Sequence, residues 1–212
     1  MVFFVTFEGG DGTGKTTQLH ALNSFLIENG RNCLVTREPG GTSLGKLIRQ
    51  VLVEVSDQDI ASSTELFLYL ADRAQHVNEI IRPAIDAGKV VLCDRFTDST
   101  VAYQGYGRGI DLGLLHQLNH LADAGVRPDI TFLLDCPVEL GLSRAVKRQI
   151  ESGQPREDRF ERERIEFHDK VRAGFLEMAH AEPARFRIID ASRSVEEVWR
   201  DIKQIAEREI LR

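Results

Sequence analysis

A short segment near the start of the chain has the residue types and the spacing that bind phosphate. Residues 9–16, GGDGTGKT, fit the pattern G-x-x-x-x-G-K-[ST] between an apolar run and a helical pattern. Successive main-chain N–H groups can wrap phosphate oxygens only where no Cβ intervenes, which explains the glycines. The helix that follows would add its unpaired N–H groups and the positive end of its dipole. The segment therefore predicts a nucleoside triphosphate site rather than an ordinary glycine-rich turn.

Two side chains of this segment would act on the triphosphate directly. Lys15 is expected to reach the β- and γ-phosphates as a catalytic group, and the Thr16 hydroxyl is expected to bind Mg²⁺. The full set of predicted ATP-binding residues is Gly9, Gly10, Asp11, Gly12, Thr13, Gly14, Lys15, Thr16, Thr17 and Arg144.

The phosphate-binding pattern does not say where the γ-phosphoryl group goes. The sequence has no N-K-x-D, which GTPases use to read their base, and large motor-type ATPases need a far longer chain. Several later arginines instead favour a small kinase, in which arginine side chains hold a second, anionic substrate.

Charged residues follow two of the predicted strands. Arg37 and Glu38 end one strand in TREPGGT, and Asp94 and Arg95 end another in CDRFTDS. Ligands of open α/β folds bind at the carboxyl edge of the sheet, where these residues must lie. We expect Asp94 to join the Mg²⁺ shell and Arg95 to clamp a phosphate. An ion pair between neighbouring strand ends, without a binding role, is the alternative.

A helical segment has a pattern suited to a nucleobase. In ELFLYLADRAQH, Tyr69 and Arg73 are four residues apart and therefore share one helix face. A ring below a base and a guanidinium at its edge would form a base pocket. Because arginine only donates hydrogen bonds, it favours a carbonyl at position 4 of a pyrimidine over an amino group. A core residue beside a surface residue is the alternative interpretation.

The stretch RQIESGQPREDRFERER is polar, crowded with both charges and interrupted by Gly and Pro. It predicts a mobile loop that enters a helix, with a lid over about residues 148–160. An arginine at the γ-phosphate can be worth a factor of ~10³ in phosphoryl transfer, and the glycine-rich segment has none. We predict that Arg159, or in second place Arg156, supplies it, with Arg148 and Arg144 nearby. A solvated loop paired within itself is the alternative.

These groups need a scaffold that brings distant segments to one edge. Five apolar runs predict strands covered on both faces, at 2–7, 32–37, 89–94, 130–135 and 185–190. Helical patterns cover 15–29, 43–55, 63–87, 98–104, 112–124, 138–151, 161–180 and 194–211. The alternation predicts an α/β, three-layer P-loop NTPase fold, with helices on both faces of a parallel sheet. Because no long linker divides the chain, residues 1–212 are expected to form a single domain.

Composition excludes several partners. The chain has 212 residues, and its formal net charge of −6 argues against a general nucleic-acid binder. Three separated cysteines, Cys33, Cys93 and Cys136, indicate reduced thiols in a cytoplasmic protein rather than a zinc site. The opening residues lack a basic leader, and no apolar run is long enough for a membrane span. His116 and His120 are one helical turn apart, but no further metal ligand is evident.

Five motifs, in this order and over almost the whole chain, together resemble bacterial thymidylate kinases: FEGGDGTGKTTQ, TREPGG, LADRAQHV, DRFTDSTVAYQGYGRG and DRFERE. The resemblance implies transfer of the ATP γ-phosphoryl group to dTMP, giving dTDP and ADP, with Mg²⁺. It also implies a five-stranded parallel sheet and a homodimer. The lid motif resembles that of the family members whose catalytic arginine comes from the lid.

The resemblance assigns roles around the acceptor. It implies that Arg95 binds the dTMP phosphate and Arg73 the thymine carbonyl, and that Thr100 and Gln104 meet the base edge near N3. Tyr103 would crowd the ribose 2′ position. Further implied acceptor residues, near the sugar 3′-OH, the Mg²⁺ shell or the pocket wall, are Glu8, Glu38 and Arg49.

One departure from the family pattern concerns the stacking ring. Tyr69 stands where the family usually has Phe, which keeps the ring and adds a hydroxyl that needs a partner. The segment GYGRG (105–109) is expected to be a flexible loop beside the acceptor. The segment DAS (190–192) is expected to touch adenine, or else to reflect only a helix N-cap at Ser192 or Ser194.

Two rival functions stay open at this point. One is a kinase for a different nucleotide, nucleoside or small metabolite. The other is a regulatory module that binds ATP, signals by lid closure and turns over no acceptor.

Overall fold

A computed structural model of the protein describes residues 3–53, 60–152, 160 and 163–211. Its five strands form one parallel sheet in the order β2-β3-β1-β4-β5, as expected from the sequence. The strands are β1 (Phe4–Glu8), β2 (Cys33–Arg37), β3 (Val90–Asp94), β4 (Ile130–Asp135) and β5 (Phe186–Asp190). Each predicted strand is present, with its start one or two residues later in four of the five cases.

The helices lie between the strands where the periodicity predicts them. They are α1 (Lys15–Glu28), α2 (Ser43–Val53), α3 (Ser62–His76), η1 (Val77–Ile81), α4 (Arg82–Asp86), α5 (Thr97–Thr100), η2 (Val101–Gly107), α6 (Leu112–Asp123), α7 (Val138–Ser152), α8 (Ile165–Ala181) and α9 (Val195–Glu209). The segments η1 and η2 are π-helical turns that continue α3 and α5, so the chain is helical throughout 62–86 and 97–107.

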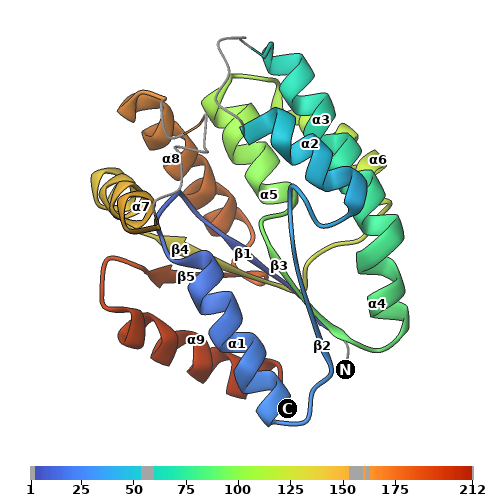
Figure 1. Ribbon diagram of the computed structural model, residues 1–212, viewed down its shortest axis with the longest axis vertical. Coiled ribbons are helices and arrows are strands. Elements are labelled where there is room, and N and C mark those ends of the chain that lie inside the picture. Colours follow the sequence, from blue (N-terminus) through green and yellow to red (C-terminus); the bar gives the residue numbers. More distant parts are fainter. Residues whose placement is uncertain (1–2, 54–59, 153–159, 161–162, 212) are drawn as a thin grey trace.

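The sheet is covered on both faces because its side chains alternate between two cores. Val5 and Phe7 point into the core that α1 and α9 share, whereas Phe4 packs with β3 and the η1–α4 segment on the opposite face. Figure 1 shows α1 and α9 together on one side of the strands, with α3, α4 and α8 on the other. The result is the three-layer α/β architecture expected from the sequence.

The expectation of a flexible GYGRG loop is wrong. Residues 105–107 complete η2 and pack tightly between α6 and α8. A Cβ on Gly105 would collide with Leu112, and one on Gly107 would collide with the Phe167 ring. These glycines therefore serve close helix packing, which short-range sequence patterns cannot distinguish from loop flexibility.

Candidate active site

The glycine-rich segment connects the end of β1 to the start of α1. Gly9 and Gly12 have positive φ angles of 132° and 71°, and a Cβ on either would run into a main-chain carbonyl of Leu134 or Gly141. Gly14, with φ 88°, is the N-cap of α1. Glycine is therefore required for both the turn and its close packing, and the backbone geometry is that of a phosphate-binding loop.

Lys15, the first residue of α1, lies folded over this loop. Its side chain is nearly buried, and Nζ donates to the carbonyl oxygens of Gly9 at 3.1 Å and Gly10 at 2.7 Å. Burial, together with the positive charge of Arg95, lowers the pKa of Lys15 to about 8. An anionic phosphate at this point would favour the charged ammonium group.

A cavity of about 320 Å³ opens beside the loop and collects residues from six separate segments of the chain. It is the size of a small-molecule site. The sequence-predicted residues that line it are Asp11, Gly12, Gly14, Lys15, Thr16, Thr17, Arg37, Glu38, Arg49, Tyr69, Arg73, Asp94, Arg95, Thr100, Tyr103 and Gln104. The structure thus brings residues of the glycine-rich segment 9–16 (the triphosphate loop) and residues of the predicted acceptor pocket together around one cavity.

Some predicted residues lie elsewhere. Gly9, Gly10 and Thr13 line a second, smaller cavity of about 30 Å³ on the other side of the loop. Arg144 donates to the carbonyl oxygens of Ala191 and Ser192, at 2.6 and 3.0 Å, and so joins α7 to the loop after β5. Arg156 and Arg159 fall outside the described residues. Arg148, which is exposed on α7, lines the main cavity.

Two of the oxygen groups predicted for Mg²⁺, those of Thr16 and Asp94, lie side by side. The Thr16 hydroxyl donates to Asp94 Oδ2 at 2.5 Å, across the gap between α1 and the end of β3. One hydroxyl and one carboxylate suit Mg²⁺, which keeps several waters and takes its other ligands from phosphates. Among the described residues, no group of three His, Cys, Asp or Glu side chains is arranged for a metal. The pair therefore fits a metal that arrives with a nucleotide.

Arg95 lies between the triphosphate loop and the rest of the cavity. Its guanidinium donates to Gly9 O at 3.0 Å, to Asp11 Oδ1 at 2.6 Å and to Tyr103 Oη at 3.2 Å. The same group lies over the Tyr103 ring, 5.1 Å from its centroid. Burial alone would raise the pKa of Asp11, but the charges of Arg95 and Lys15 hold it below its usual value. Arg95 thus lies on the wall of the cavity, in direct contact with the loop.

Glu8 does not line this cavity, contrary to the expectation that it reaches a sugar hydroxyl or the metal. Its side chain is completely buried beneath the 95–99 turn, where Oε1 accepts the Phe96 N–H at 2.7 Å and Oε2 accepts the Ser99 hydroxyl at 2.6 Å. Burial, followed by the charge of Asp98, raises the pKa of Glu8 to about 8. Both carboxylate oxygens are therefore engaged by the protein itself.

Arg73 forms the buried floor of the predicted base pocket, with 1% of its surface exposed. Its Nε donates to Glu38 Oε2 at 2.9 Å, and its Nη2 forms an ion pair with the same oxygen at 2.8 Å. Its Nη1 donates to Thr100 Oγ1 at 2.9 Å and to Asn119 Oδ1 at 2.7 Å. Asn119 was not predicted from the sequence, because α6 carries no motif that links it to α3.

The predicted acceptor pocket has a second layer of polar side chains behind Gln104, which lines the cavity. Gln104 Nε2 donates to Glu65 Oε1 at 2.9 Å, and Arg108 pairs with the same buried carboxylate. Arg108 also pairs with Glu163 at 2.6 Å, just after the predicted lid. Sequence reasoning missed Arg108, although the charged run around 163 was a signal that a partner of opposite sign was needed.

The aromatic wall was only partly predicted. The Tyr69 ring lies 6.5 Å from the Phe160 ring, and the Tyr103 ring lies 5.4 Å from it, edge on. Phe160 is 4% exposed and lines the main cavity. Phe160, which belongs to the motif DRFERE, therefore adds a third aromatic ring beside Tyr69 and Tyr103, the two rings predicted from the sequence.

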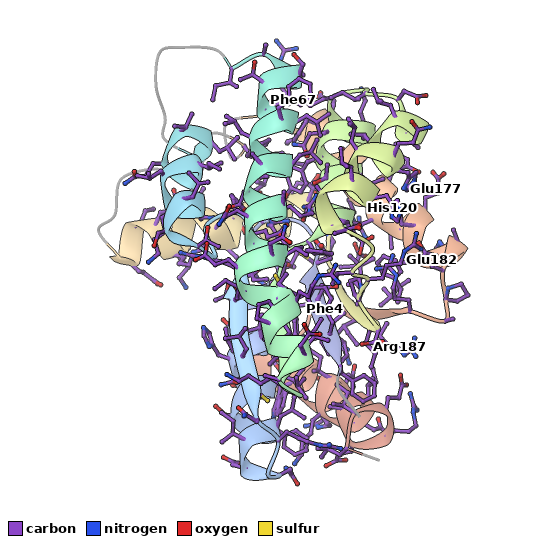
Figure 2. The ribbon with its side chains drawn as sticks, turned by 90° about the vertical axis from the view of Figure 1, so that its right-hand side faces the viewer. Phe4, Phe67, His120, Glu177, Glu182 and Arg187 are labelled. Atoms are coloured by element: carbon purple, nitrogen blue, oxygen red, sulfur yellow. The ribbon has the colours of Figure 1, made fainter. Side chains whose placement is uncertain are left out.

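Two further sequence predictions can be placed. His120, on the surface of α6, lies 3.9 Å from Asp123, and it points outward in Figure 2. No metal arrangement of the described residues includes it. Ser194 is the N-cap of α9 and forms a capping box with Glu197, so the helix-cap alternative for the segment after β5 is confirmed.

Asp72 allows a prediction about the pH dependence of stability. The residue is fully buried, and its Oδ1 accepts the Gly40 N–H at 3.1 Å. Burial, followed by the charge of Glu38, raises the pKa of Asp72 from 3.8 to about 6. A raised folded-state pKa contributes stability that is complete below the unfolded-state pKa and is lost as the pH rises through the folded-state value.

The variant Asp72→Asn keeps an acceptor for the Gly40 N–H but cannot ionise. We expect its free energy of unfolding, relative to that of the wild type, to rise by up to about 3 kcal/mol as the pH increases from about 4 to 7. Urea unfolding of both proteins at several pH values measures this difference, in which all shared titrations cancel. A difference that stays constant with pH would contradict the prediction.

Relatives of the chain match its sequence over nearly its full length. The sequence model of the thymidylate kinase family matches residues 7–202. A thymidylate kinase of Solidesulfovibrio magneticus is 55% identical over 201 residues, covering 92% of this chain and 96% of the relative. A thymidylate kinase of Nitratidesulfovibrio vulgaris is 51% identical over 200 residues, covering 94% and 93%.

A solved structure agrees with this result. The thymidylate kinase of Ehrlichia chaffeensis matches the fold with a TM-score of 0.76 at 38% sequence identity, over 97% of this chain and 98% of that chain. The residues that the family model matches include the triphosphate loop, the Arg95 turn and the aromatic pocket. By sequence and by fold, the chain belongs to the thymidylate kinase family.

Proposed function

We propose that the protein transfers the γ-phosphoryl group of ATP to dTMP, giving dTDP and ADP. The observation that carries this proposal is the position of Arg95, whose guanidinium lies 3.0 Å from the Gly9 carbonyl of the triphosphate loop. A phosphate held by Arg95 would therefore lie close to the terminal phosphate of a nucleotide held by that loop. Such a head-to-head arrangement is what in-line phosphoryl transfer needs.

The triphosphate would bind through the main chain of 9–14 and through Lys15. Thr16 and Asp94 would hold Mg²⁺, which neutralises phosphate charge during transfer when it is bound. An oxygen of the dTMP phosphate attacks the γ-phosphorus as the bond to the β–γ bridging oxygen breaks, and the electron pair leaves with ADP. No general base is required, because the monophosphate oxyanion is already a nucleophile.

The base pocket supports a pyrimidine with a carbonyl at position 4. We propose that thymine stacks on Tyr69 and meets the donor groups of Arg73, with Thr100 and Gln104 near N3 and Tyr103 near the ribose 2′ position. Arg73 is held rigidly by Glu38 and Asn119, so its orientation is set before the substrate binds. Arg37 and Arg49, on the cavity wall, would add positive charge for the phosphate.

Three further features are proposed from the resemblance. The lid would supply the catalytic arginine, Arg159 or Arg156. The protein would be cytoplasmic, and no described helix is long and apolar enough to cross a membrane. It would also be a homodimer, and large apolar side chains exposed on the neighbouring helices α2, α3 and α6 offer a surface for a second copy, among them Leu47, Phe67 and Leu121. Phe67 lies toward the outer end of α3 in Figure 2.

A panel of acceptors tests the proposed reaction. Radiolabelled ATP with Mg²⁺ is offered dTMP, dUMP, dCMP, dGMP or thymidine, and acceptor-free ATP hydrolysis is the control. We expect dTMP to be the best substrate, with dUMP lower by only about tenfold, because a methyl group is worth ~1 kcal/mol. We expect dCMP to be poor, because its 4-amino group would face the Arg73 donors.

The panel also separates the rival functions. A kinase for another nucleotide or metabolite would transfer label to a different acceptor, and a preference for dCMP would contradict the role of Arg73. A regulatory module would bind ATP and label no acceptor. Failure of dTMP to accept label at any concentration would overturn the proposal.

A further inference from the structure

The buried carboxylate of Glu8 is used entirely by one turn. Glu8 ends β1, directly before the triphosphate loop, and is 0% exposed. Both hydrogen bonds that the structure gives its side chain go to residues 96–99, namely to the Phe96 N–H and to the Ser99 hydroxyl. A buried carboxylate is costly unless its partners are well placed, so these two contacts hold the turn firmly.

The turn that Glu8 holds contains a residue in an unusual backbone conformation. Arg95 has a φ of 70°, which is uncommon for a residue with a long side chain. Its own N–H continues the sheet by donating to Phe7 O at 3.0 Å, and the next N–H, of Phe96, turns to Glu8. Two hydrogen bonds therefore hold the backbone around Arg95. Its own N–H is bound by the main chain of β1, and the N–H of Phe96 is bound by the side chain of Glu8, the last residue of β1.

A second connection runs from Glu8 to the guanidinium of Arg95. The Ser99 hydroxyl donates to Glu8 Oε2 at 2.6 Å and accepts from Arg95 Nη1 at 3.2 Å. Because Glu8 Oε2 accepts the hydroxyl hydrogen, the lone pairs of Ser99 are free to face the arginine. Glu8 therefore orients both the backbone and the side chain of Arg95 without touching the cavity.

Among the described residues, the charged neighbours of Glu8 are engaged by other partners. Its neighbour Asp98 is engaged by Arg185, with Nη1 to Oδ2 at 2.6 Å and Nη2 to Oδ1 at 3.0 Å. The Arg95 guanidinium is directed toward Gly9 O and Asp11. The orientation of the Glu8 carboxylate is consequently determined by the turn.

We propose that Glu8 is a positioning residue for the acceptor phosphate, which holds Arg95 in its left-handed conformation through Phe96 and aims its guanidinium through Ser99. The proposal deepens the proposed function and rests on it for its kinetic readout. It assigns Glu8 neither to the sugar nor to the metal.

A double-mutant cycle tests this role. We expect Glu8→Ala to lower kcat/KM for dTMP by roughly 10- to 100-fold, the range for leaving a buried N–H donor without its acceptor, with KM for ATP changed by less than about threefold. In an Arg95→Ala background, the same change should cost less than about threefold, because residues that act through one another are not additive. A simple structural defect would instead cost the same in both backgrounds.

Two further variants sharpen the cycle. Glu8→Gln should recover activity to within about threefold of the wild type, because its amide oxygen can still accept the Phe96 N–H while its amide nitrogen donates to Ser99. The matched control is Asp129→Ala. Asp129 Oδ2 accepts the Phe4 N–H at 2.8 Å, so this variant also removes a carboxylate that holds a main-chain N–H, but at the opposite end of β1. It should leave both KM values unchanged.

Hydrogen exchange provides a readout that needs no substrate, so failure of the proposed function and failure of this proposal are distinguishable. We expect the Phe96 amide to exchange at least about tenfold faster in Glu8→Ala than in Asp129→Ala, since only the former loses its acceptor. If Glu8→Ala does not fold, Ser99→Ala replaces it in the kinetic cycle. In the exchange experiment Glu8→Gln replaces it, and the Phe96 amide of that variant should stay protected. Equal kinetic losses in both backgrounds, or unchanged Phe96 exchange in Glu8→Ala, would overturn the proposal.

Discussion

Replacing Arg95 with alanine should lower kcat/KM for dTMP by about 10³-fold, while KM for ATP stays within about threefold of the wild type. The Arg95 guanidinium contacts the triphosphate loop directly, at 3.0 Å from Gly9 O and 2.6 Å from Asp11 Oδ1. When a phosphate binds, the N–H groups of Arg95 would exchange these contacts for charge-assisted hydrogen bonds to the phosphate oxygens. Alanine has no such donors. Steady-state kinetics with each substrate varied separately measures both parameters.

Arg95→Lys gives this prediction a finer test. A lysine keeps the positive charge but cannot span the loop carbonyl, Ser99 and Tyr103 at once, as the planar guanidinium does. We therefore expect only partial recovery, by about tenfold over alanine.

Arg82→Ala is the matched control for Arg95→Ala. Arg82 is an exposed arginine of α4 that donates to Ala124 O, away from the cavity, so its loss should leave the kinetics unchanged. An Arg95→Ala enzyme that loses affinity for ATP and keeps its affinity for dTMP would contradict the assignment.

Replacing Arg159 with alanine should lower kcat by about 10³-fold with little change in KM for dTMP. The physical reason is that the triphosphate loop has no arginine at its variable positions, Gly10, Asp11, Gly12 and Thr13. Charge that develops on the transferred phosphoryl group needs a donor from elsewhere in the chain. Rapid-quench measurement of a single turnover separates this chemical step from product release.

The other arginines of the same region serve as comparisons. Arg156 is the second choice for the catalytic role, and its replacement should have a smaller effect than that of Arg159. Arg148 lines the cavity from α7, so Arg148→Ala tests whether a described arginine already performs this task. Arg144 is engaged by the carbonyl oxygens after β5, and Arg144→Ala should act mainly on ATP affinity or stability. A fully active Arg159→Ala enzyme would move the role to one of these residues or exclude a lid arginine.

Both predictions concern one electrostatic problem. Two negatively charged phosphate groups must approach within bonding distance. Each of them therefore needs a positively charged side chain of its own to offset the repulsion. Lys15 and Arg95 both donate a hydrogen bond to the carbonyl oxygen of Gly9. The shared carbonyl places the two cations near each other, which contributes to the lowered pKa of Lys15.

Much of the fold follows from local sequence. Buried strands read as short runs of Val, Ile, Leu and Phe, and a parallel sheet brings all their carboxyl ends to one edge. For this reason Arg37, Asp94 and Arg95 could be placed beside the triphosphate loop from their positions at the ends of apolar runs. The loop itself was predictable because its chemistry lies in consecutive residues.

The sequence alone determined which segments meet at the active site; the tertiary structure decided what each side chain does there. Glu8 could be placed at the correct edge, yet only packing shows that it turns away from the cavity to hold the 95–99 turn. Asn119 lies 46 residues from Arg73, its partner, and Arg108 lies 55 residues from Glu163. The physical reason is that a side-chain hydrogen bond depends on the relative placement of two packed elements, and no periodicity within either element records it.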